Sequence, residues 1–141
     1  MRTQESGPDL DYYIDGLKPP YDSAGQAKIG HTLDRYGIPF FYRHPVLICE
    51  NGRRTIWRPD FTLPTYNSMV IEYDWARHGA LDASGRHARS DVYRLNGIAA
   101  LFLEPADLTR PHWQQRLYDQ LEKSYHQPLA YLRDDPVARR R

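Results

Sequence analysis

The chain has 141 residues, a formal net charge of +1 and 40% apolar residues, a profile typical of a globular protein with one sizeable core. No apolar run is long enough to cross a membrane, and the polar N-terminus lacks the apolar stretch of a secretion signal. The single cysteine, Cys49, excludes an internal disulfide or a cysteine-based zinc cluster. It also indicates a reducing compartment, the cytoplasm.

The first predicted elements are an irregular arm, a helix and a strand. Glycines and prolines make residues 1–22 irregular. Ser23 is a typical N-cap for a helix that runs to about Tyr36, and Gly37 can end that helix in the left-handed conformation. The apolar and aromatic segment 38–50 then predicts a strand.

A hairpin turn, two further strands and a second helix follow. The Asn-Gly dipeptide at 51–52 is a strong signal for a tight turn. Strands are expected over 54–63 and 69–75 because both segments are rich in apolar and aromatic residues. A helix is predicted over about 86–96, where Gly97 ends it.

The last part of the chain predicts a buried strand and a final helix. The continuous apolar run 98–104 is typical of a strand covered on both faces. Thr109 can cap a helix that extends to about Tyr125, and residues 127–141 form a basic tail. The order αβββαβα within one domain, 23–126, predicts a mixed central sheet flanked by helices.

Acidic residues lie on both sides of the turn around Tyr66. In a hairpin symmetric about this residue, Asp60 faces Glu72 and Arg58 faces Asp74, all on one side of the strands. Opposed β-carbons would be about 4.5–5.5 Å apart. The other side carries apolar residues that form a core layer: Trp57, Phe61, Leu63, Met69, Ile71 and Trp75.

Two interpretations of this acidic face remain open. A hard divalent cation such as Mg²⁺ takes oxygen ligands, usually one or two carboxylates, and would relieve the repulsion between Asp60 and Glu72. Alternatively, the face is polar and solvated, with Arg58 neutralising Asp74. Pro59 cannot donate to a strand ladder, so a bulge or strand end is expected beside the acids.

Five ordered segments together carry a family resemblance. They are "SAGQ" (23–26), "GIPFFYRHP" (37–45), "RPDFTLP" (58–64), "VIEY" (70–73) and "RSDVYRLNGIAALFLEPADL" (89–108). In this order and spacing they resemble the PD-(D/E)XK nuclease superfamily, in particular its small prokaryotic and phage members. The resemblance covers roughly residues 22–120 of this chain.

The resemblance implies a restriction-endonuclease-like αβββαβ core and a metal-dependent endonuclease that hydrolyses DNA phosphodiester bonds. Asp60 and Glu72 match the metal-binding acids, which would hold Mg²⁺ or Mn²⁺. In such nucleases the metal lowers the pKa of a bound water and polarises the scissile phosphate.

The site that the resemblance implies has two departures in this chain. Gln26 stands where relatives have a metal-associated glutamate, and Arg89 stands where this subgroup has a lysine. Arginine can stabilise phosphate charge, but its pKa is too high for proton transfer. Asp74 is expected to complete the site as a third carboxylate unless Arg58 neutralises it, and Tyr93 is expected to support it.

These departures leave a second function open, namely a catalytically degenerate nuclease-fold module that binds nucleic acid or scaffolds a larger nucleoprotein complex. In either case DNA is favoured over RNA as the partner, and a homodimer is a further candidate assembly. Clustered arginines can contact phosphates or simply form a solvated basic surface. The expected nucleic-acid-binding residues are Arg53, Arg54, Arg58, Arg86 and Arg94.

Overall fold

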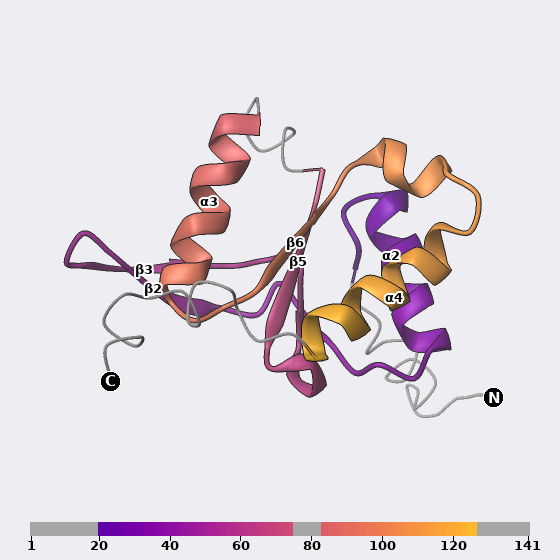
Figure 1. Ribbon diagram of the computed structural model, residues 1–141, viewed down its shortest axis with the longest axis horizontal. Coiled ribbons are helices and arrows are strands. Elements are labelled where there is room, and N and C mark those ends of the chain that lie inside the picture. Colours follow the sequence, from indigo (N-terminus) through magenta and orange to yellow (C-terminus); the bar gives the residue numbers. More distant parts are fainter. Residues whose placement is uncertain (1–19, 75–82, 127–141) are drawn as a thin grey trace.

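The computed structural model describes residues 20–74 and 83–126, which form a mixed α/β fold (Figure 1). This part contains three α-helices, a mixed four-stranded sheet and a separate two-stranded ribbon. The elements are α2 (Ala24–Arg35), β1 (Phe41–Tyr42), β2 (Val46–Glu50), β3 (Arg53–Trp57), β4 (Phe61–Leu63), η1 (Pro64–Tyr66), β5 (Met69–Tyr73), α3 (Ala83–Leu95), β6 (Ala100–Leu103), η3 (Pro105–Thr109) and α4 (Trp113–His126). The predicted α/β class with a mixed sheet is confirmed.

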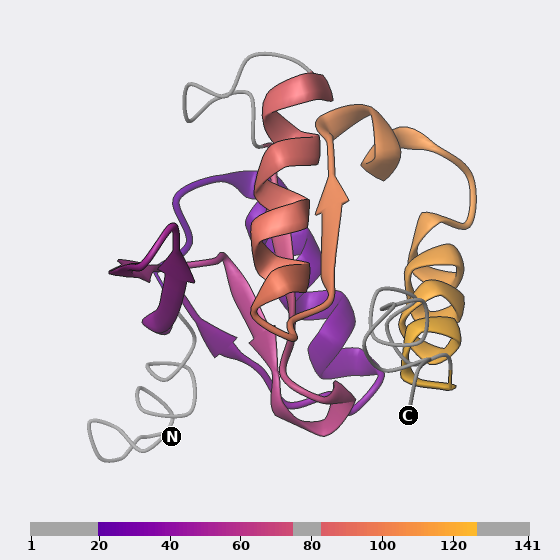
Figure 2. The same ribbon diagram turned by 60° about the vertical axis from the view of Figure 1, so that its left-hand side comes forward.

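The main sheet has the strand order β1-β4-β5-β6, and strands β2 and β3 pair only with each other in the ribbon. Strand β4 runs antiparallel to β1 and β5, whereas β5 and β6 are parallel. Parallel neighbours need a crossover connection, and α3 lies within that connection. Helices α2 and α4 cover one face of the sheet and α3 covers the other (Figures 1 and 2).

Alternation along β5 divides the interior into two clusters. Met69, Ile71 and Tyr73 pack in the larger cluster with residues of α2 and α4. Val70 packs on the opposite face with residues of α3 and the ribbon. Because side chains alternate along a strand, Glu72 shares the α3 face with Val70.

The first helix forms as its sequence predicts. The Ser23 hydroxyl accepts a hydrogen bond from the Gln26 backbone N–H at 3.2 Å, which caps the helix. Gly37 follows the helix with a φ of 71°, a conformation that costs glycine little. Ile29 and Leu33, four residues apart on one helical face, are fully buried.

The predicted strands 38–50 and 54–63 are each divided in two. Arg43 adopts a left-handed φ of 56° between β1 and β2, which turns the chain out of the main sheet. Pro59 lies between β3 and β4, and its missing N–H cannot continue a ladder. The expected strand end beside the acids is therefore present, and the segment between the two breaks forms the ribbon.

The hairpin register around Tyr66 is confirmed within the two central strands. Phe61 pairs with Ile71 and Leu63 pairs with Met69 in the antiparallel ladder of β4 and β5. All four of these side chains are buried. A one-residue slip would therefore turn these side chains away from the larger cluster and would turn Thr62 or Glu72 toward it.

The predicted extension of this ladder toward the acids is wrong. Strand β4 begins at Phe61, so Arg58 does not face Asp74 in the ladder. Trp57 instead pairs with Val46 in the ribbon, and its expected partner Trp75 lies outside the described residues. The division at Pro59 accounts for both differences.

The last helix begins later than predicted. Thr109 does not cap it; its hydroxyl donates to the Ala106 carbonyl at 2.7 Å, within η3. The chain then turns at His112, which has a φ of 60°, and α4 starts at Trp113. Leu117 and Leu121 are buried against the core as their spacing predicts.

None of the helices within 20–74 and 83–126 is long and apolar enough to cross a membrane. The longest of them, α4, has 14 residues, whereas a membrane span needs about 20.

Candidate active site

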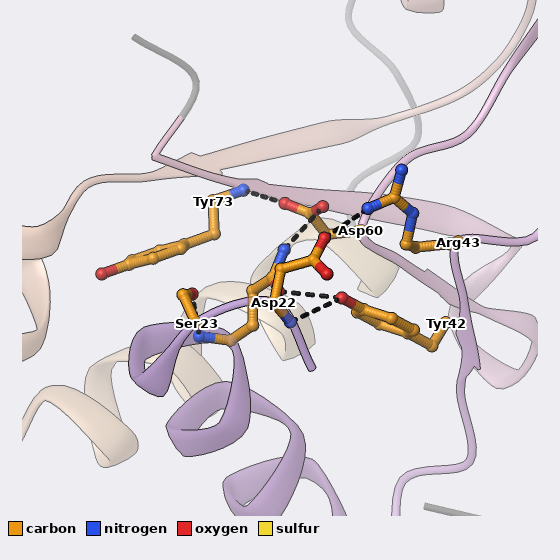
Figure 3. Close-up of polar contacts among 7 residues, drawn as sticks. Asp22, Ser23, Tyr42, Arg43, Asp60 and Tyr73 are labelled. Carbon is orange, nitrogen blue, oxygen red and sulfur yellow. Dashed lines mark hydrogen bonds and ion pairs between the residues drawn. The ribbon is translucent and has the colours of Figure 1, made fainter. Parts of the chain in front are cut away.

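Asp60 joins three parts of the fold through its carboxylate and backbone (Figure 3). The side chain is 4% exposed. Its Oδ1 accepts a hydrogen bond from Gln26 Nε2 at 3.0 Å, and its Oδ2 accepts one from the Tyr73 backbone N–H at 2.7 Å. The Asp60 carbonyl accepts from the Arg43 N–H at 3.0 Å. The residue thereby connects α2, β5 and the turn after β1.

A glycine permits the close approach of α2 to β5 at this point. A β-carbon added to Gly25 would lie 2.1 Å from the Tyr73 hydroxyl oxygen, so the tyrosine ring occupies the space that a side chain would need. This approach places the next residue, Gln26, beside Asp60. The "SAGQ" segment therefore positions the helix as well as supplying the glutamine.

The orientation of the Gln26 amide is fixed by its neighbours. Its Oε1 accepts from the Asp22 backbone N–H at 2.9 Å and from the Tyr42 hydroxyl at 2.8 Å. With two donors on the oxygen, the amide nitrogen is directed at Asp60. Gln26 is fully buried and presents a neutral donor where the resemblance implies an acid.

The position of Asp22 is held by a further contact at the edge of this network. Its carboxylate forms an ion pair with the Arg43 guanidinium (Figure 3). Both side chains are nearly half exposed, so the pair contributes little to stability. It does connect the two segments whose backbones contact Gln26 and Asp60.

Glu72 lies on the face of β5 that α3 covers and is held by two side chains of that helix. Its Oε2 accepts from the Tyr93 hydroxyl at 2.6 Å and from Arg89 Nε at 3.0 Å. Arg89 also forms an ion pair with the same oxygen, which lies 2.9 Å from its Nη2. The carboxylate is 5% exposed and the guanidinium side chain 17% exposed, so this is a largely buried charge pair.

An aromatic side chain of the ribbon, Trp57, packs against the arginine of this pair. The Arg89 guanidinium carbon lies 3.9 Å from the centre of the Trp57 ring, within the range of a cation–π contact. Trp57 also packs edge-on against Tyr93, with ring centroids 5.0 Å apart. Burial, reinforced by the Glu72 carboxylate, raises the pKa of Tyr93 far above its ordinary value. Tyr93 therefore remains a hydrogen-bond donor to Glu72.

The two carboxylates are connected to adjacent residues of β5. Asp60 binds the backbone N–H of Tyr73, which is the neighbour of Glu72. The predicted direct opposition of Asp60 and Glu72 in a ladder is wrong, because β4 begins one residue after Asp60. Both acids are buried, so the interpretation of a solvated polar face is also wrong.

The structure places the remaining predicted residues in different surroundings. Asp74 follows β5 with a left-handed φ of 54°, and its N–H donates to the Leu103 carbonyl at 2.8 Å. Arg94 is ion-paired with Asp91 on the exposed side of α3. The side chain of Arg86 lies outside the described residues. Three predicted basic residues are exposed on or next to the ribbon: Arg53, Arg54 and Arg58.

The carboxylates of Asp60 and Glu72 are the candidate ligands for a hard divalent cation. Within residues 20–74 and 83–126, no group of three or more acidic, histidine or cysteine side chains is arranged to bind a metal. Mg²⁺ commonly uses only one or two carboxylates and keeps several waters, and Asp60 and Glu72 could supply these.

Two residues of the site are not identified by the sequence. The pattern assigns Trp57 to a core layer of the main sheet, and it lies instead against Arg89 in the ribbon. Tyr42 belongs to the segment "GIPFFYRHP", but that segment does not indicate its role, which is to orient Gln26 through its hydroxyl. The position of Pro59 could have indicated the first difference, because a ladder broken there frees Trp57 to pair elsewhere.

A scan against protein-family models finds no family that matches the chain, and searches of curated proteins and of solved structures find no match either. The functional argument therefore depends on the geometry of the site.

Proposed function

We propose that the protein is a metal-dependent endonuclease of PD-(D/E)XK type that hydrolyses DNA phosphodiester bonds. One observation carries the proposal. The residues selected by the ordered motifs come from three elements, α2, the β4–β5 hairpin and α3, and their hydrogen bonds link them through two adjacent residues of β5, Glu72 and Tyr73. The strand order and the parallel β5–α3–β6 connection agree with a restriction-endonuclease-like core.

Each residue has a role that follows from its contacts. Asp60 and Glu72 would hold Mg²⁺ or Mn²⁺, which supplies charge stabilisation at the phosphate and an activated water. Gln26 and the Tyr73 N–H keep the Asp60 carboxylate in one orientation. Tyr93 does the same for Glu72.

Arg89 has the role of a phosphate ligand in this proposal. Its planar guanidinium can form two parallel hydrogen bonds to phosphate oxygens and cannot exchange a proton near neutral pH. In the structure it bonds to Glu72, so binding of a phosphate would exchange one anionic partner for another. Trp57 would keep the guanidinium plane in place during that exchange.

The test is a cleavage assay with two isosteric substitutions. Purified protein is incubated with supercoiled plasmid, single-stranded DNA and RNA, with Mg²⁺, with Mn²⁺ or with a chelator. Wild type should cleave DNA only with metal, and Asp60→Asn and Glu72→Gln should reduce cleavage to background. The control Asp34→Asn changes an exposed acid of α2 and should cleave normally. Cleavage that survives Asp60→Asn would overturn the assignment.

A second function is favoured by one observation, the ion pair between Arg89 and Glu72. If that pair persists in solution, the chain is a nuclease-fold module that binds nucleic acid without cutting it, or that scaffolds a nucleoprotein complex. It would then show no metal-dependent cleavage. DNA affinity that falls steeply with salt would support the binding module, and a protein partner without DNA affinity would support the scaffold.

A further inference from the structure

The β2–β3 ribbon stands apart from the main sheet. It extends past α3 at the left of Figure 1 and is again separate from the sheet in the turned view of Figure 2. Its two strands are joined by Asn51 and Gly52, which have φ values of 52° and 77°. Such a two-residue turn keeps the ribbon narrow, with strands about 4.7–4.9 Å apart.

The register gives the ribbon two different faces. On the face toward α3, Ile48 is fully buried and Trp57 packs on Tyr93. On the outward face, Leu47 is paired with Ile56. These two aliphatic side chains are 54% and 53% exposed, so a pair of large apolar residues faces away from the body of the molecule.

The outward face also carries positive charge near the turn. Arg54 is paired with Cys49 on this face, and Arg53 is paired with Glu50 on the other. Both arginines are exposed. The ribbon contains two arginines and one glutamate, and a third arginine, Arg58, directly follows it, so the segment 46–58 carries a net positive charge.

The ribbon is anchored to α3 at two points. The Asn96 side chain accepts from the Cys49 N–H at 2.9 Å and donates to the Cys49 carbonyl at 3.0 Å. At the other end, Trp57 lies against Arg89 and Tyr93, the residues that hold Glu72. The ribbon is therefore fixed relative to the candidate active site.

We infer that this ribbon is a DNA-binding arm whose outward face, Leu47, Cys49, Arg54 and Ile56, enters the major groove of duplex DNA. The major groove is about 12 Å wide and admits a two-stranded ribbon. Arginines near the turn contact phosphates or guanine edges, and the aliphatic pair contacts thymine methyl groups. The inference rests on the proposed action on DNA and adds the element that binds the duplex and its groove.

The first test measures affinity without cleavage. A short fluorescein-labelled duplex is titrated with the full chain in chelator, and anisotropy is followed over a salt series. Arg53→Ala combined with Arg54→Ala should weaken binding at least about tenfold and reduce the salt slope by about 0.9 for each phosphate that the variant no longer neutralises. The matched control, Arg110→Ala with Arg116→Ala, removes two exposed arginines outside the ribbon and should change neither quantity.

The second test uses the single cysteine of the chain as a probe. Cys49 is exposed and lies on the outward face. Duplexes carrying an activated disulfide tether on a cytosine in the major groove, or on a guanine in the minor groove, are offered to the protein. Cys49 should form a mixed disulfide with the major-groove tether and not with the minor-groove tether, and Cys49→Ser should form neither.

The outcomes separate this inference from the proposed function. Unchanged affinity in the Arg53/Arg54 variant, or crosslinking to the minor-groove tether alone, would contradict the proposal that the ribbon binds DNA. Neither result would bear on the proposed metal-dependent cleavage, which is tested by the cleavage assay. If Leu47→Ser with Ile56→Ser dissociates a dimer in sedimentation and leaves DNA affinity unchanged, the outward face is a protein interface and the inference is wrong. Loss of cleavage in Asp60→Asn with DNA binding retained supports both proposals.

Discussion

The two carboxylates of the candidate site are bound by residues of different helices and by different chemistry. On the α2 face, Asp60 accepts from an amide and a backbone N–H, both neutral donors. On the α3 face, Glu72 accepts from a guanidinium and a phenol. The ion pair with Arg89 indicates that charge compensation contributes to holding Glu72. Substitutions on the two sides should therefore have different costs and different responses to metal.

The largest effect is expected from Arg89→Met. This change leaves the Glu72 carboxylate buried without its guanidinium, which should lower the free energy of unfolding by about 3–5 kcal/mol. The measurement is urea denaturation at neutral pH. The double variant Arg89→Met with Glu72→Gln should recover much of the loss, because the buried charge is then absent.

Arg94→Met is the matched control for that prediction. Arg94 pairs with Asp91 at 2.8 Å, but both side chains are about half exposed. Such surface pairs contribute about 0–1 kcal/mol, so the variant should unfold close to wild type. Equal losses in the Arg89 and Arg94 variants would show that the Glu72 pair is solvated in solution.

Gln26→Glu should have the next largest effect, and it should depend on metal. The new carboxylate oxygen would replace the amide donor 3.0 Å from Asp60, so two acceptors would face each other. Without metal the free energy of unfolding should fall by about 3 kcal/mol. Mg²⁺ or Mn²⁺ should restore it in proportion to occupancy of the site, as measured by thermal melting over a metal titration.

An exposed pair on α4 provides the control for this substitution. Gln115 donates to Asp119 at 2.8 Å, the same chemistry one helical turn apart on the surface. Gln115→Glu should therefore cost less than about 0.5 kcal/mol and show no response to metal. A metal response shared by both variants would contradict a cation site at Asp60.

Tyr93→Phe should have a smaller effect, confined to the Glu72 face. It removes one hydrogen bond to a buried carboxylate, with an expected cost of about 2 kcal/mol. In the proposed nuclease it should also reduce cleavage, because Glu72 loses an orienting contact. Tyr66→Phe is the comparison, since the Tyr66 hydroxyl also donates to a carboxylate, that of Glu122, in a less buried setting; its cost should be lower and cleavage unchanged.

The smallest effect is expected beside the Asp60 network, at Tyr21. Its hydroxyl is buried and has no hydrogen-bond partner among the described residues, so Tyr21→Phe should be neutral or stabilising by less than about 1 kcal/mol. Burial raises the pKa of Tyr21 from its ordinary 10.0 to about 12. Between these values the folded protein binds more protons than the unfolded chain, so stability falls as the pH rises.

Removing Tyr21 should therefore change the alkaline limb of the stability profile. Wild type should lose stability from pH 10 toward pH 12, and Tyr21→Phe should lose less over that interval. Urea denaturation at neutral pH and across the alkaline range measures both. Identical alkaline losses would mean that the hydroxyl is hydrated in the folded state.

Short sequence signals predict the structure correctly where the conformation depends on only one or two residues. The Ser23 cap, the left-handed Gly37 and the Asn-Gly turn at 51–52 all form as expected, because each depends on the conformational preferences of one or two residues. The register of β4 with β5 is predictable as well, since only one alignment buries the apolar set that includes Phe61 and Ile71.

The sequence predicts which residues belong to the site better than it predicts how they contact one another. The motifs bring Arg89 and Tyr93 to the neighbourhood of Glu72, where the structure has them. They do not indicate that Asp60 bonds to Gln26, because that contact depends on how closely α2 approaches β5. Long-range packing of this kind has no period or spacing along the chain by which it could be detected.

The contact between Asp60 and the Tyr73 N–H has a consequence for how such proteins evolve. The ladder of β4 and β5 begins at Phe61, and just beyond its end the Asp60 carboxylate accepts a hydrogen bond from the Tyr73 N–H of β5. Selection for folding alone would preserve this aspartate, even in a descendant that had lost catalysis. Among relatives, conservation of Asp60 would therefore indicate that the hairpin is intact. Substitutions at positions 26 and 89 would indicate whether the activity has been kept or lost.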